Sequence, residues 1–163
     1  GYLCCVNRLE GPQTDLPLYA RYLPVKMPSE RHFYLDFLRG VPTQIREVME
    51  LLRIGLEEGR TPPRVSLGGV VEQIRGMVEG GMEVFDKPIR DSFHLPEEND
   101  LKEECNNLIH GTGGVSESFA QLASFLESEY IPNLRTDISA VTGYPNGKVY
   151  YEDCLKFHTT TQM

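Results

Sequence analysis

Residues 115–130, VSESFAQLASFLESEY, are the stretch that decides the fold. Their apolar members recur every three to four residues and make one stripe, composed of Val115, Phe119, Leu122, Ala123, Leu126 and Tyr130. This period places the stripe on one face of an α-helix, with the polar residues on the other face. Thr112 or Ser116 can cap the start of the helix, and Pro132 ends or kinks it. The stretch therefore predicts a helix of the core.

Two segments upstream carry the same pattern. The first starts with Pro42 in its first turn, ends near Gly59, and has an apolar face of Ile45, Val48, Met49, Leu52 and Leu56. After the rigid corner Thr61-Pro62-Pro63, the second has the face Leu67, Val70, Val71, Ile74, Met77 and Val78. The glycines of the second segment, Gly68, Gly69 and Gly76, are tolerable where another helix packs closely. We therefore expect the two segments to form an antiparallel hairpin.

The remaining segments upstream are less regular. Four prolines before Ser29 predict a long connector with at most one short helix, around Leu18 to Leu23. Ser29 can cap a helix that ends at Gly40. Gly80 to Pro96 reads as an irregular loop anchored by apolar side chains, and residues 101–109 as a further helix. The run Gly111-Thr112-Gly113-Gly114 lacks the Lys-Ser/Thr of a phosphate-binding loop, so it predicts a turn between helices.

The last third begins with a turn and then returns to helical spacing. Pro145-Asn146-Gly147 is a turn signal, because Asn and Gly tolerate positive φ. After it, Tyr151, Cys154, Leu155 and His158 fall at i, i+3, i+4 and i+7, which predicts a helix from about Lys148 to Phe157. The predicted fold class is mainly α, with helical hairpins and connecting loops that are part of a larger helical domain. The predicted division is a Pro-rich connector over residues 1–41 and a helical segment over residues 42–163.

Composition excludes several partners. The net charge of −8 and the pI near 5.0 exclude a nucleic acid or an anionic membrane surface, which would need a basic stripe. No run approaches the roughly 18 apolar residues of a membrane span. The scattered acidic residues predict a solvated surface, with a cation- or mineral-binding surface as the alternative. Because the first residue is Gly1 and not Met, we expect the sequence to begin inside a longer chain or after processing.

Complete catalytic motifs are missing from this segment. It has no GxSxG, HExxH or CxxC, and no pair of histidines four residues apart, so no catalytic residue and no metal ligand is predicted. Cys4, Cys5, Cys105 and Cys154 allow two disulfides in three pairings, although the adjacent Cys4 and Cys5 would hardly bridge each other. The cysteines lean slightly toward an oxidising compartment.

Polar side chains gather near the C-terminus. They are Tyr150, Tyr151, His158 and the hydroxyls of Thr159, Thr160 and Thr161. A histidine and a tyrosine beside a scissile carbonyl could stabilise an oxyanion or move a proton. In the alternative interpretation, Tyr151 and His158 belong to one helix face that packs on the core.

The same stretches carry a family resemblance. Residues 130–135 (YIPNLR), 144–151 (YPNGKVYY) and 158–161 (HTTT) resemble the family catalogued as domain of unknown function 885. Upstream, Pro42-Thr43-Gln44-Ile45, Gly59 and Pro62-Pro63 are similar to that family's helix-and-corner pattern. The resemblance extends from about Pro42 to the C-terminus.

Full-length members of that family are mostly helical and resemble zinc metallopeptidases of the gluzincin type. The resemblance implies a His-Glu-x-x-Pro-Gly-His-type motif well downstream of His158, in which two histidines bind zinc and the glutamate polarises the attacking water. This sequence ends before any such motif. Zinc is therefore expected in the full-length protein and no cofactor in this segment. The matched residues that could supply part of a substrate cleft are Asn146, Gly147, Tyr150, Tyr151 and His158.

Three functional hypotheses follow. The first is a fragment of a secreted metallopeptidase-like protein that acts on a peptide substrate. The second is a non-catalytic extracellular protein, associated with the extracellular matrix through its helical scaffold and acidic surface. The third is a cytosolic all-helical interaction domain, which a measured disulfide would contradict.

Overall fold

The computed structural model describes residues 4–95, 98–139, 141–143 and 146–159. The described chain is mainly α, as predicted. Its helices are α1 (Pro12–Tyr22), α2 (Arg31–Glu57), α3 (Val70–Glu79), α4 (Glu83–Ser92), α5 (Asn99–His110), α6 (Val115–Phe125) and α7 (Gly147–Thr159). Short 3-10 segments cover Pro28–Glu30, Arg64–Leu67 and Ile131–Asn133, and a π-helical turn covers Leu126–Tyr130. Among the described residues no strand forms, and only Pro63 and Arg135 make an isolated bridge.

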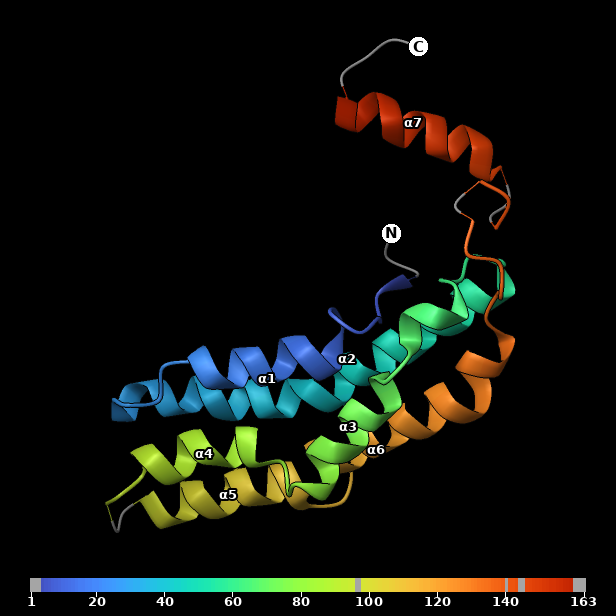
Figure 1. Ribbon diagram of the computed structural model, residues 1–163. Coiled ribbons are helices and arrows are strands. Elements are labelled where there is room, and N and C mark those ends of the chain that lie inside the picture. The colour runs from blue at the N-terminus through green and yellow to red at the C-terminus, as the bar shows by residue number, and fades with distance from the viewer. Residues whose placement is uncertain (1–3, 96–97, 140, 144–145, 160–163) are drawn as a thin grey trace.

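Helix α6 lies at the centre of the core. All six residues of the predicted stripe from Val115 to Tyr130 are buried. Both α2 and α3 pack on α6, while α1 packs on α4 and α5 joins α2, α4 and α6 (Figure 1). The prediction of a core helix at residues 115–130 is confirmed, with Pro132 in the 3-10 turn that ends it.

Helix α2 corrects two predictions at once. Instead of one helix ending at Gly40 and another beginning at Pro42, a single helix of 27 residues runs through both positions. Its buried face is continuous and contains Tyr34, Leu35, Leu38, Val41, Ile45 and Leu52. Burial of this stripe outweighs the weak helix propensity of Gly40 and the N–H that Pro42 lacks. The predicted boundary between residues 41 and 42 therefore falls inside α2.

The connector before α2 contains more helix than its prolines predicted. Helix α1 starts at Pro12, six residues before the expected Leu18, and Pro17 lies inside it. Proline is well suited to the first helical position, where its missing N–H would have no helical partner. Leu16 and Ala20 bury the inner face of α1.

The segment from Gly80 to Pro96 was expected to be irregular, and this prediction was wrong. Helix α4 occupies Glu83–Ser92 despite Pro88. Three of its apolar side chains, Phe85, Ile89 and Phe93, are buried, and their spacing of four residues is helical. Core burial of this face therefore decided the conformation.

The expected antiparallel hairpin of residues 42–59 and 67–78 is also corrected. Helix α3 begins at Val70, after Gly69 with φ 83°, and its main neighbour is α6. The glycine-rich segment thus serves as a turn before the helix. The predicted end of α2 at Gly59 and the helix over residues 101–109 are both confirmed.

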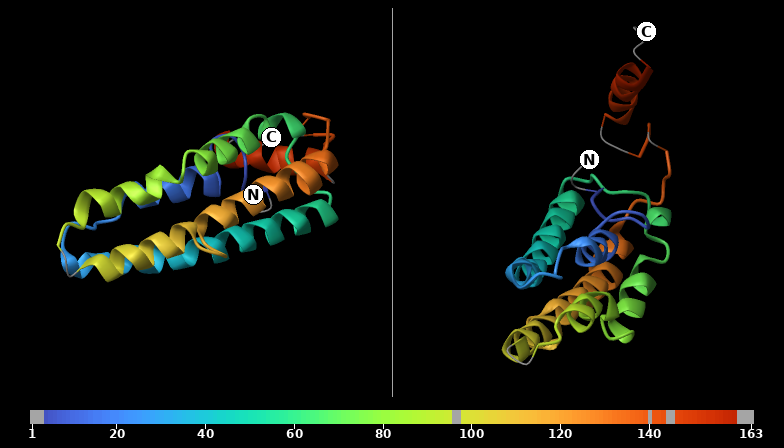
Figure 2. Two further views of the ribbon diagram at one scale, coloured as in Figure 1. Left: turned by 90° about the horizontal axis from the view of Figure 1, so that it is seen from below. Right: turned by 90° about the vertical axis from the view of Figure 1, so that its left-hand side faces the viewer.

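Figures 1 and 2 show α1–α6 together as an elongated bundle and α7 apart from it. A buried ion pair, Arg31 with Glu98, joins the start of α2 to the connection between α4 and α5. Arg31 also stacks over the Phe93 ring, 4.7 Å from its centroid. These contacts hold the end of the bundle that is far from α7.

Candidate binding face on helix α7

The turn that precedes α7 is built by Asn146. Its φ of 57° lies in the left-handed region, which Asn tolerates better than most residues. The Asn146 carbonyl accepts the N–H of Tyr150 at 3.1 Å and so starts the helix. Pro145 lies outside the described residues. The helix that follows, Gly147–Thr159, confirms the one predicted from about Lys148 to Phe157.

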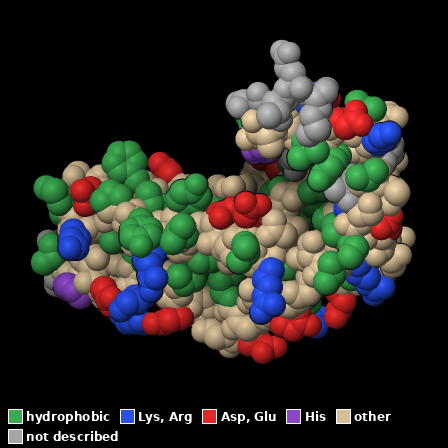
Figure 3. Space-filling view, turned by 45° about the horizontal axis from the view of Figure 1, so that its top comes forward, with side chains coloured by type: hydrophobic (Ala, Val, Ile, Leu, Met, Phe, Trp, Pro, Cys, Tyr) green, Lys and Arg blue, Asp and Glu red, His purple; other side chains and the backbone are tan. Residues whose placement is uncertain are grey.

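Helix α7 projects from the bundle as an arm. It is joined to the bundle by the segment after Leu134, and in the right-hand view of Figure 2 it stands clear of the other helices. The space-filling view in Figure 3 is hollowed between this arm and the bundle. Gly147 is the only residue of α7 that is fully buried. The arm therefore offers most of its side chains to solvent.

The five predicted substrate-binding residues all lie on this arm. Tyr150 is 57 % exposed and Tyr151 44 % exposed. Asn146 and His158 are exposed and Gly147 is buried. Tyr151 and His158 share one helix face with the half-buried Cys154 and Leu155, as their spacing predicted. The two side chains are thus not buried in the core, and their substrate-binding role stays a prediction.

The described surroundings of His158 are an aromatic ring and a threonine hydroxyl. The imidazole meets the edge of the Phe157 ring, with centroids 5.1 Å apart and planes at 85°. The Thr159 hydroxyl donates to the Leu155 carbonyl at 2.6 Å, and Thr160 and Thr161 lie outside the described residues. The arm can provide aromatic faces, hydroxyls and an imidazole to a ligand.

The second feature of the molecule is an apolar groove of about 980 Å³, which the sequence patterns did not predict. One wall is the connection between α1 and α2, and the other consists of the end of α3 and helix α4. Its residues come from segments more than 45 positions apart, such as Met27 and Met77. No local spacing could have revealed it.

A comparison with protein families identifies the chain. Residues 3–163 match the family described as bacterial protein of unknown function, DUF885. The chain belongs to the DUF885 family. The match begins well before Pro42, where the resemblance was expected to start, and so includes α1 and all of α2. No curated protein and no solved structure matches this DUF885 chain.

Zinc, which the DUF885 resemblance implies, does not fit the residues that the structure describes. Nowhere in residues 4–95, 98–139, 141–143 or 146–159 do three His, Cys, Asp or Glu side chains gather as a metal site would require. His110 and Asp86 lie 2.9 Å apart but are only a pair. The four cysteines of the DUF885 chain are free thiols, so they form neither of the two disulfides considered from sequence.

The lengths and hydropathy of the helices can be compared with what a membrane span requires. None of the helices in the described part of the DUF885 chain combines the length and the apolar character that crossing a membrane requires.

Proposed function

We propose that this DUF885 chain supplies a peptide-binding face to a peptidase-like protein, and that α7 is the element that contacts the peptide. The observation that carries the proposal is a helix outside the bundle with Tyr150, Tyr151 and Phe157 exposed. A helix of a globular protein ordinarily buries its large apolar side chains. Aromatic side chains gathered on an open surface are typical of interaction sites.

The dimensions of the arm suit a short extended peptide. Asn146 and His158 are separated by twelve positions, which is about 18 Å along a helix. An extended peptide of five or six residues covers about the same length. The rings of Tyr150 and Tyr151 would contact apolar side chains of the peptide, and their hydroxyls would reach its amides. Asn146 and His158 add hydrogen-bonding groups at the two ends.

The chemistry of hydrolysis is a further part of the proposal and rests on family membership and resemblance alone. The described residues lack a metal-ligand cluster, so the ligands of any zinc would come from other residues of the natural protein. Secretion also rests on the resemblance, because the four free thiols lend it no support. The non-catalytic, matrix-associated protein is the competing hypothesis.

Peptide binding can be measured directly. Fluorescein-labelled hexapeptides of randomised sequence would be titrated with the chain and followed by fluorescence anisotropy. We expect the double substitution Tyr150→Ala and Tyr151→Ala to weaken binding at least tenfold, while the conservative Tyr150→Phe and Tyr151→Phe pair keeps most of it. Phe33→Ala is the matched control, because Phe33 is 63 % exposed on α2 and lies outside the arm.

Circular dichroism would verify that the helical content of each variant is unchanged. Equal affinity of the alanine variant and the wild-type chain would overturn the proposed binding face. A peptidase assay on the intact natural protein, with and without a zinc chelator, separates the catalytic from the matrix-associated hypothesis. Activity abolished by the chelator supports the first, and peptide binding with no cleavage supports the second.

A further inference from the structure

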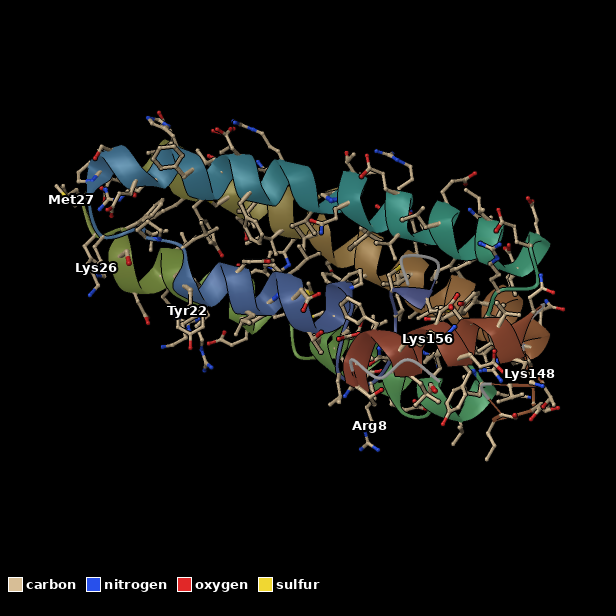
Figure 4. The ribbon with its side chains drawn as sticks, turned by 90° about the horizontal axis from the view of Figure 1, so that it is seen from above. Arg8, Tyr22, Lys26, Met27, Lys148 and Lys156 are labelled. Atoms are coloured by element: carbon tan, nitrogen blue, oxygen red, sulfur yellow. The ribbon has the colours of Figure 1, made fainter. Side chains whose placement is uncertain are left out.

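The apolar groove lies at the end of the bundle opposite the arm. Figure 4 shows Tyr22 at the end of α1, and Lys26 and Met27 of the α1–α2 connection, at one end of the molecule and Lys148 of α7 at the other. The groove volume of about 980 Å³ is at the upper end of the range of roughly 300–1,000 Å³ in which small molecules bind. This site is therefore separate from the proposed peptide-binding face.

The lining of the groove is mostly apolar. Met77 and Val84 form one wall and are partly buried, and Pro88 lies beside them on α4. On the opposite wall Tyr22 is 74 % exposed and Met27 60 % exposed. Two large apolar side chains that flank an open groove leave a surface that an apolar ligand would cover.

The charged side chains that line the groove differ in whether they form ion pairs. Two of its three carboxylates are in ion pairs, Asp91 with Lys87 at 2.7 Å and Glu83 with Arg90. The third, Glu30, accepts the backbone N–H of Met27 at 2.9 Å and keeps its negative charge. By contrast, Arg21 and Lys26 make no ion pair with any residue that the structure describes. Three positive and three negative side chains line the groove, and Arg21 and Lys26 are the two lining cations left for a ligand once Lys87 is paired with Asp91.

We propose that the groove binds a single-chain amphipathic anion, such as an alkyl carboxylate. The alkyl chain would lie against Met77, Val84 and Pro88, where it is removed from water. The head group would pair with Arg21 and Lys26, which are exposed and line the same groove. Two cations beside an apolar lining match a ligand with one compact negative group and a long apolar part.

Isothermal titration calorimetry tests the proposal on the full chain. Octanoate, decanoate and dodecanoate would be titrated below their critical micelle concentrations, with decanol as the uncharged ligand. We expect saturable binding of the acids, an affinity that rises roughly fourfold with each added methylene, and weaker binding of decanol. The double substitution Arg21→Gln and Lys26→Gln should weaken decanoate at least tenfold and leave decanol unchanged.

A control variant removes the same number of positive charges at sites outside the groove. Arg8→Gln combined with Arg64→Gln also removes two exposed cations, neither of which lines the groove. This variant should bind decanoate as the wild-type chain does. Absence of saturable binding, equal affinity for decanoate and decanol, or an equal loss in the control variant would each overturn the proposal. Val84→Asp should weaken decanol by making the apolar wall polar, and should weaken the acids further because the new carboxylate repels them. Retention of both ligands would place them outside the groove.

Discussion

At the scale of the residue, burial of the Cys105 thiol makes the free energy of unfolding depend on pH. Its side chain is fully buried in α5, and removal from water raises its pKa from 9.0 to about 12, with the nearby Glu104 carboxylate acting in the same direction. Between these two values the unfolded chain releases the thiol proton while the folded chain keeps it. The free energy of unfolding must therefore fall as the pH rises above about 9.

Replacement of Cys105 by Ala should flatten this alkaline decline. We expect the wild-type chain to lose up to about 1.4 kcal/mol per pH unit above pH 9 relative to Cys105→Ala, since one proton is released on unfolding. Urea unfolding at pH 8, 9, 10 and 10.5 in the presence of a reductant measures this difference. Cys154→Ala, on the exposed arm, is the control and should follow the wild-type curve. Parallel curves for wild type and Cys105→Ala would show that the thiol does not cause the decline.

At the scale of the element, a glycine inside α2 and a glycine just after its end have opposite functions. Gly40 is exposed in the middle of the helix, and a Cβ added there meets nothing within 4 Å. Gly59 follows the helix with φ 66°, where the Arg60 N–H donates to the Gly55 carbonyl at 2.8 Å and the Gly59 N–H to the Leu56 carbonyl at 3.2 Å. This pair of bonds is a Schellman motif, and it ends α2.

The same substitution should therefore change stability in opposite directions at the two glycines. Gly40→Ala is expected to raise the free energy of unfolding by about 0.5–1 kcal/mol, because alanine restricts the unfolded chain and fits the helix. Gly59→Ala should lower it by about 1 kcal/mol, because a Cβ is strained at positive φ. Urea unfolding at pH 7 measures both. A stabilising Gly59→Ala would contradict the assigned helix end.

At the scale of the whole molecule, the bundle and the arm differ in how much of their apolar side-chain surface is buried. Helices α1–α6 share one core, which includes Tyr34, Phe85, Phe119 and Tyr130. Helix α7 contributes no residue to that core in the described chain. A helix of 13 residues without tertiary packing is marginally stable in water.

Amide hydrogen exchange should therefore be faster in the arm than in the bundle. We expect the amides of residues 150–158 to exchange with little protection, and those of residues 119–125 in α6 to exchange only on global unfolding. Mass spectrometry of peptic peptides at pH 7 measures both segments in one experiment. Saturating peptide should increase protection in α7 alone if the arm is the binding face. Protection of free α7 equal to that of α6 would contradict the separation into bundle and arm.

Several elements were determined by the sequence itself, because their causes act within one or two turns. The stripe from Val115 to Tyr130 specifies α6, Gly59 ends α2, and the spacing of Tyr151 and His158 specifies α7. The helix that carries the candidate site could thus be predicted. The roles of Asn146, Gly147, Tyr150, Tyr151 and His158 in binding substrate remain predictions.

Other features were decided only by the tertiary structure. Local rules place breaks at Gly40-Pro42 and at Pro88, yet α2 and α4 continue through them because their apolar faces are buried against neighbouring helices. The exposure of α7 and the groove between Met27 and Met77 depend on which segments meet in space. Periodicity and capping act locally, whereas burial depends on partners that are distant in the sequence, and here the free energy of burial exceeded the local cost.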